Sequence, residues 1–195
     1  MQNPVLTPQE MFDILARERG WMFNAGGQII WDQARGGAAA GGPLGGQAVF
    51  ALAQVVDKNG EPIELARGEY LNGGYHAEER ALKALEKHIA PNAALQGGKL
   101  TVLVDQVPCC GHRHDCRGKL QSYAFRKGLT LEIWLPTRPK VRGAGNVAPK
   151  TAMRTSMQTR VPGWHLELYR PEVDEPCCRQ GRKATLKQKH GWGTG

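Results

Sequence analysis

The feature of this sequence that most restricts its fold is a helix-forming segment enclosed by strand-forming segments. Residues 76–89 (HAEERALKALEKHI) repeat their apolar side chains at the spacing of an amphipathic helix. Residues 48–56 and 63–70 precede this segment and predict two strands of a hairpin around the turn Asp57-Lys58-Asn59-Gly60. Residues 99–107 (KLTVLVDQV) follow it and are the best candidate for a central strand. A helix between strands of one core indicates an α/β protein.

Further elements extend this pattern in both directions. Residues 115–127 and 129–135 predict a second helix and the strand that follows it, and residues 164–169 predict one more short strand. Near the N-terminus, Thr7-Pro8 and Glu10 have the residue types and spacing of a helix cap. This order predicts a three-layer α/β fold, in which helices flank a mixed sheet of about five strands.

Composition divides the chain into three parts. Residues 1–46 are expected to form an N-terminal helical leader and a Gly-rich linker, since positions 36–46 read GGAAAGGPLGG. Residues 47–170 form the predicted domain, which carries a basic, Pro/Gly-rich insertion at 138–163. Residues 171–195 are polar, basic and Gly-containing, so we expect a flexible tail.

Positive charge is concentrated in the last part of the chain. The 195 residues carry a net charge of +8. Residues 1–137 hold 14 Lys and Arg against 14 Asp and Glu, whereas residues 138–195 hold 12 against 4. A basic segment of this kind favours a polyanion such as a nucleic acid, because neutralised phosphates release counterions. A solubilising tail is the alternative, and charge alone does not separate the two.

Membrane-spanning and secretory segments are not expected. The hydrophobic fraction of 41% is that of a globular protein, and the longest apolar stretch, Gln47–Val56, is too short to span a bilayer. The first residues, MQNPVLTPQEM, lack the basic start, the apolar run and the cleavage site of a secretory signal. We therefore expect no membrane contact and no signal peptide in this chain.

The five cysteines fall into two groups, one of which suggests metal binding. Cys109, Cys110 and Cys116 form the first group, and Cys177 and Cys178 form the second. An odd number of cysteines with two vicinal pairs is a poor disulfide framework, and a chain of this length does not need one. The first group is predicted to contain metal ligands, and the second is interpreted as incidental thiols.

One histidine and one glutamate complete a candidate catalytic set. His76-Ala77-Glu78 opens the predicted helix, and Pro108-Cys109 follows the central strand. A catalytic zinc ion is held by three nitrogen or sulfur ligands and keeps an open position for water. One imidazole and two thiolates supply such a set, and Glu78 would lie near the water without being a ligand. Helix N-termini are expected to favour the thiolates through their dipoles.

These residues resemble the signature of the zinc-dependent cytidine deaminase superfamily, H-x-E followed by P-C-x-x-C. The resemblance covers about residues 47–137 and implies a cytidine-deaminase-like fold. It also implies that His76, Cys109 and Cys116 bind Zn²⁺ and that Glu78 is the catalytic acid and base.

The spacing of the cysteines departs from the family pattern. Six residues, CGHRHD, separate Cys109 from Cys116, whereas the family has two at this place. Cys110, His112 and His114 therefore stay open as alternatives to Cys109. A structural zinc knuckle built from these cysteines and histidines is a further alternative, although it leaves the H-x-E residues without a role.

Within the superfamily, the chain most resembles the nucleic-acid deaminases of bacterial polymorphic toxins. Such toxin deaminases are C-terminal domains of larger secreted polypeptides. The resemblance therefore implies delivery by secretion and action in the cytoplasm of a target cell. An immunity protein is a possible partner. Asn72 is a candidate for contacting a substrate sugar, with a plain loop residue as the alternative. Arg142 is predicted to hold the nucleic-acid backbone, together with other basic residues of the insertion.

The expected function is zinc-dependent hydrolytic conversion of cytosine to uracil in nucleic acid, with single-stranded DNA as the favoured polymer. Zinc would activate a water molecule that attacks C4, and ammonia would leave. Two alternatives stay open. One is deamination of a free nucleoside or of adenosine in RNA, and the other is a non-catalytic, zinc-stabilised nucleic-acid-binding protein.

Overall fold

The computed structural model describes residues 4–33, 49–70, 75–89, 95–105, 107–109, 115–137 and 155–169. The predicted Gly-rich linker, most of the basic insertion and the predicted tail lie outside these residues. The division of the chain into leader, domain and tail therefore stays a prediction.

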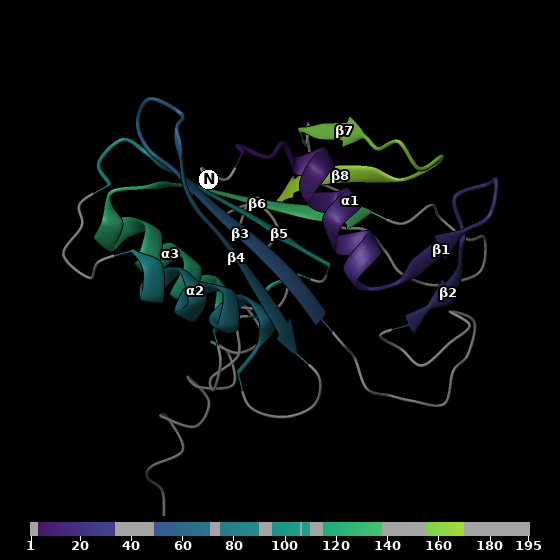
Figure 1. Cartoon of the computed structure of the whole chain (residues 1–195), viewed down its shortest axis with the longest axis horizontal. Coiled ribbons are helices and arrows are strands. Elements are labelled where there is room, and N and C mark those ends of the chain that lie inside the picture. Colours follow the sequence, from purple (N-terminus) through teal and green to yellow (C-terminus); the bar gives the residue numbers. More distant parts are fainter. Residues whose placement is uncertain are drawn as a thin grey trace, which may run out of the picture.

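A mixed sheet of six strands forms the centre of the molecule (Figure 1). Its strands in spatial order are β4 (Pro62–Tyr70), β3 (Val49–Val56), β5 (Lys99–Val104), β6 (Thr130–Thr137), β8 (His165–Tyr169) and β7 (Ser156–Gln158). β5 and β6 are parallel, and the other neighbouring pairs are antiparallel. The predicted α/β class and mixed sheet are confirmed. The sheet has one strand more than expected, because β7 extends its edge.

Two helices cover one face of this sheet. α2 (Ala77–His88) and α3 (Cys116–Lys127) lie side by side on it (Figure 1). α3 joins β5 to its parallel neighbour β6, since parallel strands need a crossover connection. Every second residue of β3, including Ala51 and Ala53, lies in a buried cluster with Leu120 of α3.

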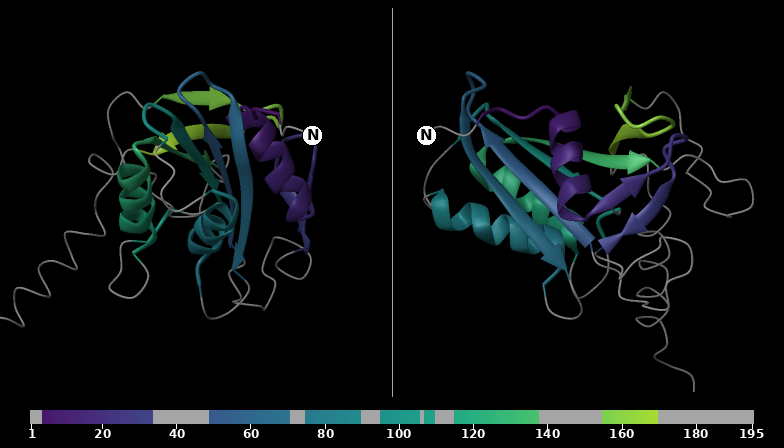
Figure 2. Two further views of the ribbon diagram at one scale, coloured as in Figure 1. Left: turned by 60° about the vertical axis from the view of Figure 1, so that its left-hand side comes forward. Right: turned by 45° about the vertical axis from the view of Figure 1, so that its right-hand side comes forward.

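A third helix, α1 (Pro8–Glu18), covers the opposite face, which gives the fold three layers (Figure 2). The helix begins where the sequence predicts. The Thr7 hydroxyl accepts a hydrogen bond from the backbone N–H of Glu10 (3.3 Å), and the Glu10 carboxylate accepts one from the backbone N–H of Thr7 (2.8 Å). This capping box satisfies backbone N–H groups that the start of a helix leaves unpaired.

The apolar side of α1 belongs to a second buried cluster on this face. Met11, Phe12 and Leu15 are fully buried there and share the cluster with Phe50 and Leu52 of β3. Burial of an apolar side chain of this size contributes about 1.5–3 kcal/mol. α1, which lies in the predicted leader, therefore packs against the six-stranded sheet as one layer of the fold. None of the helices in the described part of the chain has the length and apolar character of a membrane span.

A small hairpin that the sequence did not predict follows α1. β1 (Trp21–Phe23) and β2 (Ile29–Asp32) form a two-stranded antiparallel sheet. The side-chain oxygen of Asn24 holds the turn by accepting hydrogen bonds from the backbone N–H groups of Gly26 (3.0 Å) and Gln28 (2.9 Å). Strands of three or four residues, which include β7, are too short to show an apolar alternation.

Candidate metal centre

His76 is held by the backbone at the start of α2, where it is the N-cap residue. Its backbone N–H donates to Oε2 of Glu79 (2.9 Å), and its carbonyl oxygen accepts from the backbone N–H of Arg80 (3.0 Å). β4 approaches this helix so closely that a Cβ atom on Gly68 would lie 1.8 Å from the carbonyl oxygen of Ala77. The side chain of any other residue at position 68 would therefore displace the start of α2.

Cys109 and Cys116 come from the chain between β5 and α3. The carbonyl oxygen of Cys109 accepts a hydrogen bond from the backbone N–H of Arg117 (3.1 Å). Cys116 is the first residue of α3 and is fully buried. The N-cap residue Asp115 has a left-handed backbone (φ 35°), and its side chain accepts a hydrogen bond from the backbone N–H of Gly118 (3.2 Å). The first turn of α3 thus fixes both cysteines.

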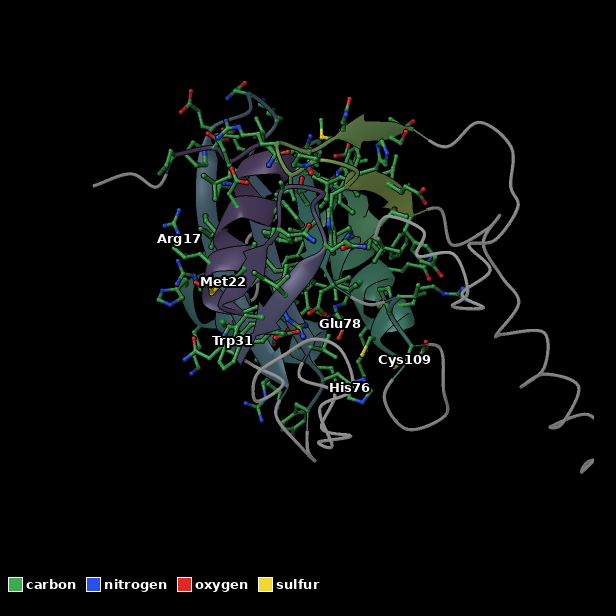
Figure 3. All side chains as sticks on the ribbon, turned by 90° about the vertical axis from the view of Figure 1, so that its right-hand side faces the viewer. Arg17, Met22, Trp31, His76, Glu78 and Cys109 are labelled. Carbon is green, nitrogen blue, oxygen red and sulfur yellow. The ribbon has the colours of Figure 1, made fainter. Side chains whose placement is uncertain are left out.

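Three predicted ligand atoms converge at the starts of α2 and α3. Figure 3 labels two of these residues, His76 and Cys109. Nδ1 of His76 lies 3.4 Å from Sγ of Cys109 and 3.2 Å from Sγ of Cys116, and the two sulfur atoms lie 3.4 Å apart. Tetrahedral zinc, with bond lengths of about 2.0–2.3 Å, places two such ligand atoms about 3.5–3.8 Å apart. An outward movement of a few tenths of an ångström would give that geometry. The residues lie close enough to bind a metal ion, and their donor set fits zinc.

Glu78 lies beside this cluster with 3% of its surface exposed (Figure 3). It is the second residue of α2, and the Cys116 thiol is among the groups that act on the pKa of its carboxyl group. Burial raises the pKa of Glu78 above its ordinary value, and the hydrogen bonds that it accepts offset only part of this rise. A carboxyl group with a raised pKa can take up and release a proton closer to neutral pH, as general acid–base catalysis requires.

The surroundings of Cys116 oppose its thiolate form. Burial raises the pKa of this thiol, and the neighbouring Glu78 carboxylate raises it further. Helix N-termini favour thiolates through their dipoles, whereas the loss of water and the neighbouring carboxylate act in the opposite direction at Cys116. Coordination to a cation reverses the balance, because a coordinating thiol is deprotonated. Cys116 is therefore better suited to be a metal ligand than a nucleophile.

Two further residues of the centre carry no motif that identifies them as functional. Glu79 is 5% exposed, and Lys119 of α3 forms an ion pair with its carboxylate. The spacing from His76 to Glu79 is that of a capping box, which could have indicated the contact within α2. No local signal indicates Lys119, which lies 40 residues further along the chain.

A second cluster of buried charges lies where the chain leaves β5. Arg19 donates to Oδ2 of Asp32 (3.0 Å) and forms an ion pair with Asp105, and these three side chains are at most 1% exposed. Asp105 also accepts a hydrogen bond from the backbone N–H of Phe50 (3.2 Å). Cys109 follows Asp105 by four residues. The cluster therefore ties α1 and the β1–β2 hairpin to the strand that leads to the metal centre.

The remaining candidate residues lie outside the described part of the chain. They are the two predicted substrate contacts, the alternative ligands and the second group of cysteines: Asn72, Arg142, Cys110, His112, His114, Cys177 and Cys178. Their roles stay predictions. Among the described residues, Cys109 lies beside His76 and Cys116, and its alternatives as a ligand are not among these residues.

No protein-family model, curated protein or solved structure matches this chain. What the structure shows is an α/β fold that brings a histidine and two cysteines close enough to bind a metal ion. The resemblance to deaminases rests on the motif residues themselves.

Proposed function

We propose that this chain is a zinc-dependent hydrolytic deaminase that converts cytosine to uracil in nucleic acid, with single-stranded DNA as the favoured polymer. The observation that carries the proposal is the convergence of His76, Cys109 and Cys116 beside the buried Glu78. A histidine and two cysteines on zinc, together with a glutamate that is not a ligand, are the groups with which zinc deaminases act on nucleobases.

The proposed reaction adds water at C4 of cytosine, breaks the bond to the exocyclic amine and releases ammonia. A bound zinc ion supplies the Lewis acid that activates the water. His76, Cys109 and Cys116 would hold the ion, and three protein ligands leave one coordination position for the reaction. Glu78 takes a proton from the water and passes it to the departing amine, a role that suits its raised pKa.

A structural zinc site explains the same geometry less completely. Structural sites close the coordination with four protein ligands, and the residues that could add a fourth ligand, Cys110, His112 and His114, lie outside the described part of the chain. The comparison of the two kinds of site therefore rests on Glu78. Burying an ionisable carboxyl group also lowers stability unless its interactions compensate. Catalysis gives the buried Glu78 a role, and a structural site does not.

The nucleic-acid substrate is proposed from the distribution of charge. Residues 1–137, which are neutral overall, include the proposed ligands and Glu78, whereas residues 138–195 carry the excess positive charge. A basic segment joined to a catalytic body favours a polyanionic substrate over a free nucleoside. From the resemblance to polymorphic toxins, we further propose a toxin domain that is delivered by secretion and acts in the cytoplasm of a target cell.

The test compares the wild type with Glu78→Gln for zinc content, for thermal unfolding and for ammonia release from single-stranded oligonucleotides. The variant should keep zinc and fold but lose roughly 10²–10⁴-fold in rate, the usual contribution of a general acid–base group. Glu86→Gln changes an exposed position on the same helix and should retain activity. Sequencing of treated DNA and RNA pools identifies the base and the polymer.

Equal rates of ammonia release for the wild type and Glu78→Gln would show that Glu78 is not the catalytic acid and base. A wild-type protein that binds zinc and nucleic acid, but releases no ammonia from cytosine or adenine substrates, would establish the non-catalytic binding protein instead.

A further inference from the structure

Glu79 and Lys119 connect the two helices that carry metal ligands. One oxygen of the Glu79 carboxylate, Oε2, accepts a hydrogen bond from the backbone N–H of His76 (2.9 Å). The other oxygen, Oε1, pairs with the ammonium group of Lys119. One carboxylate thus contacts the N-cap of α2 with one oxygen and a side chain of α3 with the other.

The ion pair lies close to the ligands on both helices. Glu79 follows His76 by three residues, and Lys119 follows Cys116 by three residues. Residues at this spacing are neighbours on a helix surface. The ion pair therefore spans the same gap between helices as the contact of 3.2 Å between Nδ1 of His76 and Sγ of Cys116.

Glu79 and Lys119 differ in solvent exposure, and this difference determines how much the ion pair contributes. The side chain of Glu79 is 5% exposed, whereas that of Lys119 is 46% exposed. An ion pair between two exposed side chains contributes little, but a buried carboxylate depends on the groups that compensate its lost hydration. Loss of the Lys119 charge would remove one of the groups that compensate the buried Glu79 carboxylate, and a less firmly held Glu79 would hold the N–H of His76 less firmly.

We propose that Glu79 and Lys119 are positioning residues of the metal centre, which fix the separation of His76 and Cys116 and so set its affinity for zinc. The inference rests on the metal site of the proposed function, and it is independent of the substrate and of deamination. Groups that hold metal ligands in place typically raise metal affinity by about 10–100-fold.

Lys119→Met is the main test, because it removes the charge from a half-exposed side chain and leaves every proposed ligand in place. We expect its zinc affinity, measured by competition with a chromophoric chelator, to fall about 10–100-fold. The visible absorption bands of the Co²⁺-substituted protein should change, because they report the geometry of the ligands. Lys119→Arg keeps the charge and should restore both the affinity and the spectrum.

Lys99→Met is the matched control. Lys99 pairs with Glu132 (3.4 Å), its side chain is 43% exposed, and it lies at the opposite end of β5 from Cys109. This variant should keep the zinc affinity and the Co²⁺ spectrum of the wild type. A general loss of stability would lower the thermal midpoint without altering the spectrum of the folded protein.

A double-mutant cycle tests whether the two residues act as a unit. Glu79→Gln keeps an acceptor for the N–H of His76 and loses the charge that Lys119 pairs with. If Glu79 and Lys119 act only through their ion pair, the double variant Glu79→Gln/Lys119→Met should bind zinc as tightly as Glu79→Gln alone.

Wild-type affinity and an unchanged Co²⁺ spectrum in Lys119→Met would overturn the proposal, and so would an equal loss in Lys99→Met. A wild-type protein that binds no zinc overturns the metal site itself. Zinc binding without deamination overturns the proposed reaction alone and leaves the positioning role standing.

Discussion

The two buried polar clusters of this fold are completed in different ways. In one, the guanidinium of Arg19 pairs with the carboxylates of Asp32 and Asp105, so that positive and negative side chains of the chain meet. In the other, the imidazole of His76 meets two thiols beside the carboxyl group of Glu78. The chain passes from one cluster to the other within four residues.

The pKa values of the cluster around His76 distinguish it from the cluster around Arg19. Burial raises the pKa of Glu78 and of Cys116, because the loss of water disfavours the charged form of each group. A nearby cation favours the charged forms of such groups, whereas the first cluster already contains a cation, the guanidinium of Arg19. The Arg19 cluster therefore serves the fold, and the His76 cluster is suited to bind a metal ion.

Removing the cation of the first cluster should have the largest effect on stability. Arg19→Met keeps a long apolar stem but leaves the carboxylates of Asp32 and Asp105 buried without the guanidinium. Breaking a buried ion pair in this way typically costs about 3–5 kcal/mol. We expect a matching loss in the free energy of unfolding measured with urea, in one transition, since Arg19 joins α1 to the sheet.

Arg17→Met is the control for this experiment. Arg17 is exposed on α1 (Figure 3), and its substitution should change stability by less than about 0.5 kcal/mol. If Arg19→Met were as mild as this control, the guanidinium would not compensate the two carboxylates, and the contrast between the clusters would be lost.

Parts of the fold that depend on one continuous segment could be predicted from the sequence. The Thr7–Glu10 cap, the apolar stripe of α2 and the apolar run of β5 are each encoded locally, and the structure contains all three. The packing of α1 and of the β1–β2 hairpin depends on distant segments. For example, the indole N–H of Trp164 donates to the carbonyl oxygen of Gly27, 137 residues away. A contact of this kind leaves no pattern in either segment.

The candidate site likewise contains residues that the sequence indicates and residues that only the fold brings together. His76, Cys109 and Cys116 could be singled out because histidine and cysteine are sparse in this chain and because a motif relates their positions. The ion pair of Glu79 with Lys119 could not, because Glu and Lys occur on most protein surfaces and only the fold shows which of them meet. Sequence therefore indicated the ligands, and the structure was needed to find what holds them.

A second prediction concerns the backbone that supports the metal centre. A Cβ atom at position 68 would lie 1.8 Å from the carbonyl oxygen of Ala77 and 2.7 Å from the backbone nitrogen of Ala81. Gly68→Ala must therefore push α2 away from β4, and overpacking of this kind typically costs about 1–3 kcal/mol. Because the start of α2 carries His76, we expect lower zinc affinity in a chelator competition as well as a lower urea midpoint.

Gly26→Ala is the control for that substitution, since its Cβ atom would meet nothing closer than 3.4 Å. Gly68→Ala should also differ from Arg19→Met, which acts on the other cluster and should leave the zinc affinity of the folded molecules unchanged. A destabilised Gly68→Ala protein with wild-type zinc affinity would mean that β4 supports the fold but does not position His76.

The smallest expected effect is a pH dependence of stability in the metal-free protein. Burial raises the folded-state pKa of Glu78 above its ordinary value of 4.5, so the folded state binds this proton more tightly than the unfolded state does. The stability that the proton contributes is fully present below pH 4.5 and is lost as the pH rises through the folded-state pKa. Glu78→Gln has no such proton and should not show this loss.

The difference between the wild type and Glu78→Gln isolates this one group. Other carboxyl groups, such as those of Glu10 and Asp57, have lowered pKa values and contribute in the opposite direction, but they do so equally in both proteins. Urea unfolding from about pH 4 to 8 should show the wild type losing free energy of unfolding relative to Glu78→Gln. Bound zinc should reduce the loss, because a nearby cation favours the carboxylate. If the two metal-free curves ran parallel, Glu78 would titrate as an ordinary carboxyl group, and burial would not distinguish the second cluster from the first.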